Sequence, residues 1–187
     1  MIQETIITTQ DSQNKAHIAP MGIHVDADSF IIQPFLPSTT LNNFLETKVG
    51  VINFCDDVRV FAGCLTGRRE WPLMPANKIQ GQVLCCALAH TEIELIRVEE
   101  DTTRPKLVCK AVYSANHRPF NGFNRAQFSV LEAAILISRL DMLPLTKIEA
   151  EIEYLRIGLE KTAGRKELEA WGWIMAVLDQ FKGNQHP

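Results

Sequence analysis

The sequence predicts an α+β protein, with a small, mainly antiparallel β-barrel over residues 1–118 and a helical part over residues 119–187. Two observations predict this division. Short runs rich in β-branched residues, separated by turn residues, recur through the first part, as is typical of barrel strands. Near residue 118 the apolar residues change from alternation to a spacing of about 3.6, which indicates helices.

The barrel part is predicted from several short strands and one short helix. Leu41, Phe44 and Leu45 recur at helical spacing, so an amphipathic helix is expected between two strands. Residues 67–80 carry Gly, two Pro and a Trp without periodicity, which favours a long loop. The expected strands cover residues 4–9, 17–25, 30–34, 49–54, 58–65, 83–90, 91–99 and 106–113.

Three helices are predicted in the second part. The first covers residues 125–140 and is apolar nearly all round. The second is expected to begin at a capping box formed by Thr146 and Glu149, and the third follows Gly164. The predicted inward faces are Ile148, Ile152, Leu155 and Leu159 in the second helix, and Leu168, Trp171, Met175 and Leu178 in the third.

Composition excludes several classes of protein. A formal net charge of −3 and a pI near 6.0 argue against a nucleic-acid partner, which requires a basic face. The longest apolar run is too short to cross a bilayer, and the first residues lack the charged and apolar regions of a secretory signal. We therefore expect a cytoplasmic protein with no membrane partner.

Cysteine and histidine spacing indicates neither a metal site nor hydrolysis. The five Cys residues form no C-x-x-C pair, and their places in apolar runs favour buried, reduced thiols. The five His residues show neither metal-ligand spacing nor a partnered nucleophile, so no metal and no catalytic residue is assigned. His117, beside Arg118, is the only histidine in a loop of functional interest.

Polar residues gather where the short helix of the barrel part begins. Ser38, Thr39 and Thr40 open the helix and Asn43 lies one turn later. Free backbone N–H groups and the positive end of a helix dipole bind phosphate there without Lys or Arg. The alternative is that Ser38 or Thr39 is an ordinary N-cap.

The segment STTLNNFLETKVGVINF resembles the part of flavin reductase-like proteins with the pattern K-D-T-x-x-N-I-x-x-T, followed by F-V-V-N. The Thr and Asn of that pattern hold the phosphate of FMN, which implies this role for Thr40 and Asn43. Ser38 and Thr39 stand where the pattern has Lys and Asp, and the resemblance implies that they contribute main-chain and side-chain groups.

Further segments extend the similarity over almost the whole chain: ETIITT, HIAPMG, PF before the Thr cluster, VINFCDDVRVFA, GFNRAQFSVLEAAILISRL and EKTAGRKELEA. Together they resemble the DUF447 family of FMN-binding split-barrel proteins, including the helical part that simple flavin reductases lack. The resemblance implies FMN as cofactor and a homodimer with the flavin site between subunits. It also suggests a link to one-carbon metabolism that uses methanopterin.

Four further residues are candidates for flavin contacts. In such barrels the strand that holds Met21 and Gly22 passes beside the isoalloxazine ring, whereas a strand bulge is the alternative for these two residues. Asn53 and Asp56 follow the phosphate-type helix and could reach the ribityl chain or the pyrimidine edge. The alternative for Asp56 is an exposed turn.

These observations predict an FMN-binding flavoprotein that acts as an oxidoreductase on an unassigned small molecule, with the flavin carrying the redox chemistry. The alternative is a non-catalytic module that binds, stores or senses flavin.

Overall fold

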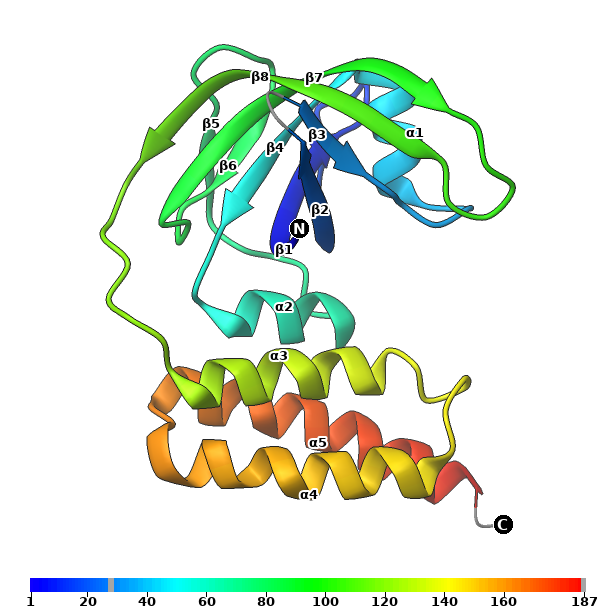
Figure 1. Cartoon of the computed structure of the whole chain (residues 1–187), viewed down its shortest axis with the longest axis vertical. Helices are drawn as coiled ribbons and strands as arrows, with labels where there is room; N and C mark the ends of the chain where they lie inside the picture. The colour runs from blue at the N-terminus through cyan, green and yellow to red at the C-terminus, as the bar shows by residue number, and fades with distance from the viewer. Residues whose placement is uncertain (27–28, 186–187) are drawn as a thin grey trace. The chain divides into compact units, whose positions relative to one another are not determined.

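The computed structural model describes residues 1–26 and 29–185, which form two compact units (Figure 1). The first unit contains Met1–Cys55 and Glu70–Phe120, and the second contains Asp56–Arg69 and Asn121–Pro187. The segment Asp56–Arg69, which the sequence analysis assigned to the barrel part, therefore belongs to the helical unit.

Within the described residues, six strands close into an antiparallel barrel, as predicted, in the order β1-β2-β3-β8-β7-β4 (Figure 1). Closure pairs every strand with two neighbours and leaves no long open edge. The strands are β1 (Ile2–Gln10), β2 (Ala16–Asp26), β3 (Ser29–Ile32), β4 (Val49–Phe54), β7 (Ala89–Glu99) and β8 (Lys106–Asn116).

Helix α1 (Thr39–Thr47) lies against the barrel and shares its core. Leu41 and Phe44 of α1 are buried together with inward-facing strand residues such as Ile52. A Cβ atom added at Gly50 of β4 would lie 2.5 Å from Cζ of Phe44. The Phe44 ring therefore packs directly on bare backbone, and only glycine fits at this position.

A hydrogen-bond network around Asn53 joins three strands. Its Nδ2 donates to the Ile6 carbonyl (3.0 Å) and to Oγ1 of Thr8 (3.1 Å), both on β1. Its Oδ1 accepts a bond from the backbone N–H of Leu84 (2.8 Å) on β6 (Gln82–Leu84). Asn53 is fully buried, so water cannot reach its amide group, and these bonds supply the partners that the amide needs.

Two expectations for residues 67–90 need correction. The region expected to be a long loop contains β5 (Leu73–Pro75), which pairs with β6 in a two-stranded sheet. The strand predicted over residues 83–90 is interrupted, because β6 ends at Leu84 and β7 begins only at Ala89. A short apolar run does not reveal where a turn divides it.

The strand predicted over residues 58–65 is wrong, because this segment forms helix α2 (Val58–Leu65). Asp57 is its N-cap, and its Oδ1 accepts a bond from the backbone N–H of Arg59 (3.3 Å). Val58 and Ala62, one helical turn apart, join the core of the second unit. A short apolar run fits both periods, so spacing alone could not distinguish a strand from a helix here.

The helical unit contains α2 together with α3 (Arg125–Ile137), α4 (Leu145–Thr162) and α5 (Arg165–Gln185). The three predicted C-terminal helices are confirmed, and so is the buried stripe of α4 formed by Ile148, Ile152, Leu155 and Leu159. The capping box is wrong, because the N-cap is Pro144 and no side chain caps the helix. On α5, Leu168 is 56% exposed and Ile174 is buried in its place.

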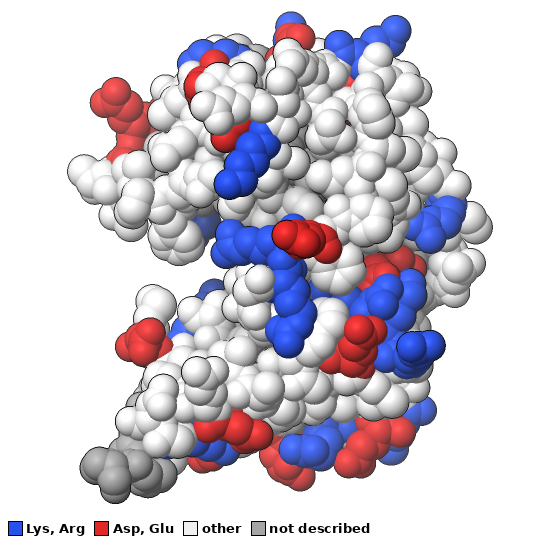
Figure 2. Space-filling model, turned by 180° about the vertical axis from the view of Figure 1, so that it is seen from behind, with Lys and Arg blue, Asp and Glu red and all other residues white. Residues whose placement is uncertain are grey.

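Charged side chains of both signs adjoin one another on the face shown in Figure 2. The buried carboxylate of Asp57 pairs with Arg59 (2.8 Å) and with Lys166 (2.9 Å). Burial alone would raise the pKa of Asp57, but hydrogen bonds and charge from these two cations outweigh it and lower the pKa. Among the described helices, none is long and apolar enough to span a membrane.

We predict that Asn53→Ala lowers the free energy of unfolding by about 3 kcal/mol, because the buried N–H of Leu84 and the carbonyl of Ile6 lose their partner. Urea denaturation followed by circular dichroism measures the change. Asn42→Ala, at an exposed position of α1, is the control and should change stability by less than about 0.5 kcal/mol. Equal effects of the two substitutions would contradict the structural role of Asn53.

Candidate functional site

The start of α1 presents hydrogen-bond donors that the protein does not use. Ser38 is the N-cap, and its Oγ accepts a bond from the backbone N–H of Leu41 (3.2 Å). Within the described chain, the backbone N–H groups and hydroxyls of Thr39 and Thr40 have no hydrogen-bond partner. Because these donors lie at the positive end of the helix dipole, they suit an anion.

Asn43 secures α1 to the barrel. Its side chain is buried, and its Nδ2 donates to Oγ1 of Thr9 at the end of β1 (3.0 Å). The structure confirms Ser38 as the N-cap, and Asn43 holds this helix start against β1. Anion binding at Thr39 and Thr40 stays a prediction.

A basic side chain from a distant part of the sequence approaches the segment before α1. The guanidinium of Arg104 donates to the Gln33 carbonyl (Nη2 to O, 2.9 Å) and lies 4.3 Å from the centre of the Phe35 ring. The backbone N–H of Leu36 also donates to the carbonyl of Thr103 (3.0 Å). The β7–β8 connection thus brings a cation to residues 33–35, shortly before Ser38, which stands where the pattern has Lys.

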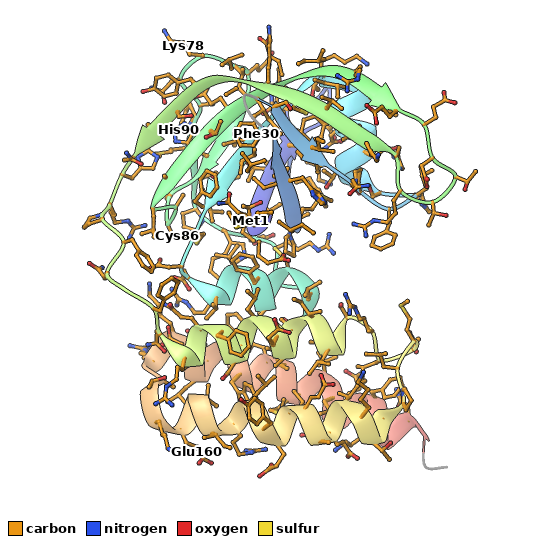
Figure 3. The ribbon with its side chains drawn as sticks, in the orientation of Figure 1. Met1, Phe30, Lys78, Cys86, His90 and Glu160 are labelled. Atoms are coloured by element: carbon orange, nitrogen blue, oxygen red, sulfur yellow. The ribbon has the colours of Figure 1, made fainter. Side chains whose placement is uncertain are left out.

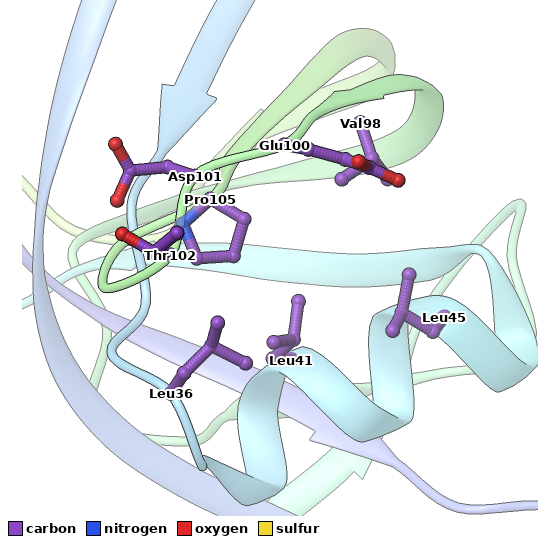
Figure 4. A pocket seen from close by; sticks show the side chains of 8 residues that line it. All are labelled: Leu36, Leu41, Leu45, Val98, Glu100, Asp101, Thr102 and Pro105. Atoms are coloured by element: carbon purple, nitrogen blue, oxygen red, sulfur yellow. The ribbon is translucent and has the colours of Figure 1, made fainter.

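A hollow of about 520 Å³ lies beside α1 (Figure 4). Its walls are mainly apolar, and Leu41 and Leu45 enter it from one face of the helix. Glu100 and Asp101 line the same hollow from the β7–β8 connection. An apolar group suits this surface, whereas the two carboxylates disfavour an anion there. The other lining residues are Leu36, Val98, Thr102 and Pro105.

Met21 and Gly22 lie on a stretch of β2 that has one strand neighbour. They pair with Thr5 and Glu4 of β1, whereas β3 pairs with β2 only from Ile23 onward. Within the described sheet, their backbone therefore has no strand partner on the side facing away from β1. A Cβ at Gly22 would lie 2.9 Å from Cγ2 of Ile2, so the side-chain space of this glycine is already occupied.

The other two candidates lie elsewhere. The amide of Asn53 is occupied on both its donor and acceptor sides by β1 and β6, inside the barrel unit. Asp56 is half-buried in the helical unit, directly before the N-cap Asp57. The structure thus brings Ser38, Thr39, Thr40 and Asn43 together and does not bring Asn53 into that group.

The structure also contains a chain of titratable groups, of which sequence reasoning singled out His117 but missed His90 and Glu92. Nε2 of His90 lies 3.3 Å from Oε1 of Glu92, and Nδ1 of His90 lies 2.8 Å from Nε2 of His117 (Figure 3 labels His90). The two imidazole rings are nearly parallel (5°) with centres 4.9 Å apart. With an N–N distance of only 2.8 Å, parallel rings at this separation lie edge to edge, and a hydrogen bond joins them.

Glu92 is a fully buried carboxylate with its own set of donors. Burial alone would raise its pKa, but backbone N–H groups of Asn77, Lys78 and Ile79 and the His90 ring donate to it and lower the pKa. An ionised carboxylate only accepts hydrogen bonds, so Nε2 of His90 donates to Glu92. Nδ1 of His90 and Nε2 of His117 then share one hydrogen bond.

His117 is the exposed end of this chain of groups. Partial desolvation, followed by the nearby His90 and Arg118, lowers its pKa, so the ring is neutral near pH 7. The arrangement can pass a proton between the surface and His90. The alternation of His90 and Glu92 on one face of β7 was the sequence signal for it. Within the described residues, no group of three such side chains is placed to hold a metal ion.

We predict that Glu92→Gln destabilises the protein at neutral pH, because an amide NH₂ would face backbone N–H groups. Glu92 stabilises the fold above the ordinary pKa of 4.5, and this contribution is lost as pH falls through the lower pKa of the folded state. The stability difference between wild type and variant should therefore shrink below about pH 4.5.

Urea denaturation at several pH values tests this prediction. Glu94→Gln is the control, because Glu94 lies on the same strand in a surface ion pair with Lys110 (3.1 Å). A difference between wild type and Glu92→Gln that stays constant from pH 7 to pH 3 would contradict an ionised Glu92.

Solved structures resemble this chain over different lengths. An FMN-bound protein from Methanosarcina mazei is 21% identical, with a TM-score of 0.82 and coverage of 94% of both chains. Pseudomonas fluorescens 2-nitrobenzoate 2-nitroreductase is 17% identical with a TM-score of 0.53, covering 61% of this chain and 64% of the nitroreductase. An FMN-binding protein from Thermus thermophilus is 15% identical with a TM-score of 0.52, covering 60% and 69%.

The two shorter matches show the split-barrel fold, and the first extends over nearly the whole chain. No curated protein matches the sequence. The model of the DUF447 N-terminal domain matches residues 3–118, and the model of the DUF447 protein of unknown function matches residues 124–176. The chain therefore belongs to the DUF447 family.

Proposed function

We propose that this protein binds FMN and that the start of α1 holds the phosphate. The observation that carries the proposal is the set of unused donors at Thr39 and Thr40, on a fold that matches an FMN-bound family member over 94% of both chains. A terminal monophosphate is small enough for a single helix start and accepts several hydrogen bonds.

The residues at this position fit a phosphate in charge as well as in donors. The helix dipole and the N–H groups of Thr39 and Thr40 are favourable to an anion, and both hydroxyls can donate. Arg104, held at the segment before α1, supplies a nearby cation in place of the missing Lys. Asn43 then acts mainly as a positioning residue through Thr9.

We propose that the flavin ring lies along β2 at Met21 and Gly22. Their backbone has no strand partner on one side among the described residues, so the polar groups on that side can bond to the ring, whereas the Met21 carbonyl accepts a bond from Oγ1 of Thr5 (2.9 Å). When bound, the flavin supplies the redox chemistry, and the protein supplies binding and orientation. Asn53 supports this region by fixing β4 to β1, and we assign it no direct contact.

We further propose that the protein is an oxidoreductase. Similarity of its barrel to a nitroreductase supports this activity class, and the chain of Glu92, His90 and His117 offers a route for the proton that accompanies electron transfer. Pterins of one-carbon metabolism are the first substrates to assay, because the sequence resembles proteins from organisms that use methanopterin. A flavin-loaded protein that no electron donor reduces would instead be the non-catalytic module.

We propose a homodimer in which a second copy covers the barrel near α1. Phe35 (59% exposed), Leu36 (46%) and Leu45 (43%) are large apolar residues on this surface, beside the 520 Å³ hollow. Exposed apolar surface of this kind is typical of a protein–protein contact. A second copy would also shield a flavin bound beside α1 from water.

We predict that Thr40→Val weakens FMN binding about ten- to a hundredfold, because a hydrogen bond to a charged group contributes roughly 1.5 to 3 kcal/mol. Quenching of FMN fluorescence during titration measures the affinity. Thr47→Val is the control, since its hydroxyl donates to the Asn43 carbonyl (2.9 Å) at the other end of α1. Unchanged affinity in Thr40→Val would place the phosphate elsewhere.

We predict that the particle in solution has about twice the mass of the 21.1 kDa chain and that Leu45→Lys converts it to a monomer. Sedimentation velocity measures the mass. Leu168→Lys, at an equally apolar exposed position on α5, is the control and should leave the dimer intact. A flavin-loaded wild-type monomer would exclude the shared site.

A further inference from the structure

Two cysteine sulfurs lie in contact within the barrel unit. Sγ of Cys55 is 3.6 Å from Sγ of Cys86, and one thiol donates a hydrogen bond to the other. Cys55 directly follows β4, and Cys86, which Figure 3 labels, lies in the turn after β6. The sequence analysis expected all five thiols to be buried, but these two are half-buried and Cys85 is exposed.

Backbone hydrogen bonds set this proximity. The N–H of Leu88 donates to the Phe54 carbonyl (2.8 Å), directly before Cys55. The N–H of Ala87 donates to the Leu84 carbonyl (3.0 Å), which closes the turn that carries Cys86. The two sulfurs therefore meet because β4 and the turn are already paired. Both cysteines stand outside regular strands, so small rotations can shorten the distance to the 2 Å or so of a disulfide.

Exposure favours thiol chemistry at this pair, because Cys55 and Cys86 are both half-buried and a cysteine must be accessible to react. Cys64 and Cys109 differ, because burial raises their pKa to about 11 and about 12. They should remain protonated and unreactive while the protein is folded.

We propose that Cys55 and Cys86 form a site of reversible oxidation, which a low-molecular-weight disulfide such as glutathione disulfide converts to an intrachain disulfide. The thiolate of one cysteine attacks a sulfur of glutathione disulfide, forms a mixed disulfide and releases one glutathione thiolate. The other cysteine, as thiolate, then attacks the protein sulfur of the mixed disulfide and releases the second glutathione. The protein loses two electrons and two protons, and glutathione disulfide is reduced to two thiols.

The position of the pair gives this oxidation a structural consequence. The Leu88 carbonyl, in the same connection, accepts bonds from the backbone N–H groups of His117 (2.7 Å) and Arg118 (3.1 Å). A Cys55–Cys86 disulfide would tie the end of β4 to the segment that holds His117. Oxidation is therefore expected to restrict motion next to the exposed end of the Glu92–His90–His117 chain.

Incubating the reduced full-length protein with excess glutathione disulfide tests the proposal. Unreacted thiols are then alkylated, and the protein is digested without reduction and mapped by mass spectrometry. We expect a Cys55–Cys86 cross-link, with Cys64 and Cys109 recovered in alkylated form only after unfolding. A cross-link between Cys85 and Cys86, or a stable glutathione adduct without any cross-link, would overturn the assignment, as would no reaction.

Two variants sharpen the result. Cys55→Ser removes the second attacking thiol, so a glutathione adduct should accumulate on Cys86 where the wild type forms the cross-link. Cys85→Ser should leave the Cys55–Cys86 cross-link unchanged, because Cys85 is exposed and outside the pair. Loss of the cross-link in Cys85→Ser would reassign the reaction to the neighbouring thiol.

Discussion

The position of α1 depends on the contact between the Phe44 ring and the bare backbone of Gly50. A side chain of any size at Gly50 would overlap the ring, so the helix could not approach β4 as closely as it does. The bond from Asn43 to Thr9 fixes the same helix to β1. These two contacts determine where the unused donors of Thr39 and Thr40 point. The candidate phosphate site therefore rests on an apolar packing constraint as much as on polar residues.

Buried polar residues fix the strands and one loop of the barrel unit in place, as the Phe44 contact fixes α1. Asn53 links three strands, and Glu92 holds the loop at residues 77–79 by accepting its backbone N–H groups. Each group has its partners, so neither carries the large cost of an unsatisfied buried polar atom. Glu92 also accepts a hydrogen bond from the His90 ring, which is bonded in turn to His117. One carboxylate thus combines a structural role with a defined chain of hydrogen bonds.

The segment Asp56–Arg69 shows how two units share one continuous chain. Asp57 is the N-cap of α2 and pairs with Arg59 and with Lys166 of α5, so its charge contributes to the helical unit. Cys55, its near neighbour in sequence, belongs to the barrel unit and contacts Cys86. Residues two positions apart therefore belong to different units, and a single boundary along the sequence cannot describe this arrangement.

By itself the sequence determined the features that depend on neighbouring residues. Alternating β-branched runs predicted most barrel strands, the stripe from Ile148 to Leu159 predicted the buried face of α4, and the hydroxyl cluster predicted the start of α1, because each is a local pattern of side chains.

Only the tertiary structure decided the rest. Val58–Leu65 is a helix because a helical core accepts Val58 and Ala62, which alternation alone could not reveal. Arg104 near α1, His117 beside His90 and Cys86 beside Cys55 are contacts between residues far apart in sequence. Strand pairing creates them, and no local pattern encodes which distant side chains a closed barrel brings together.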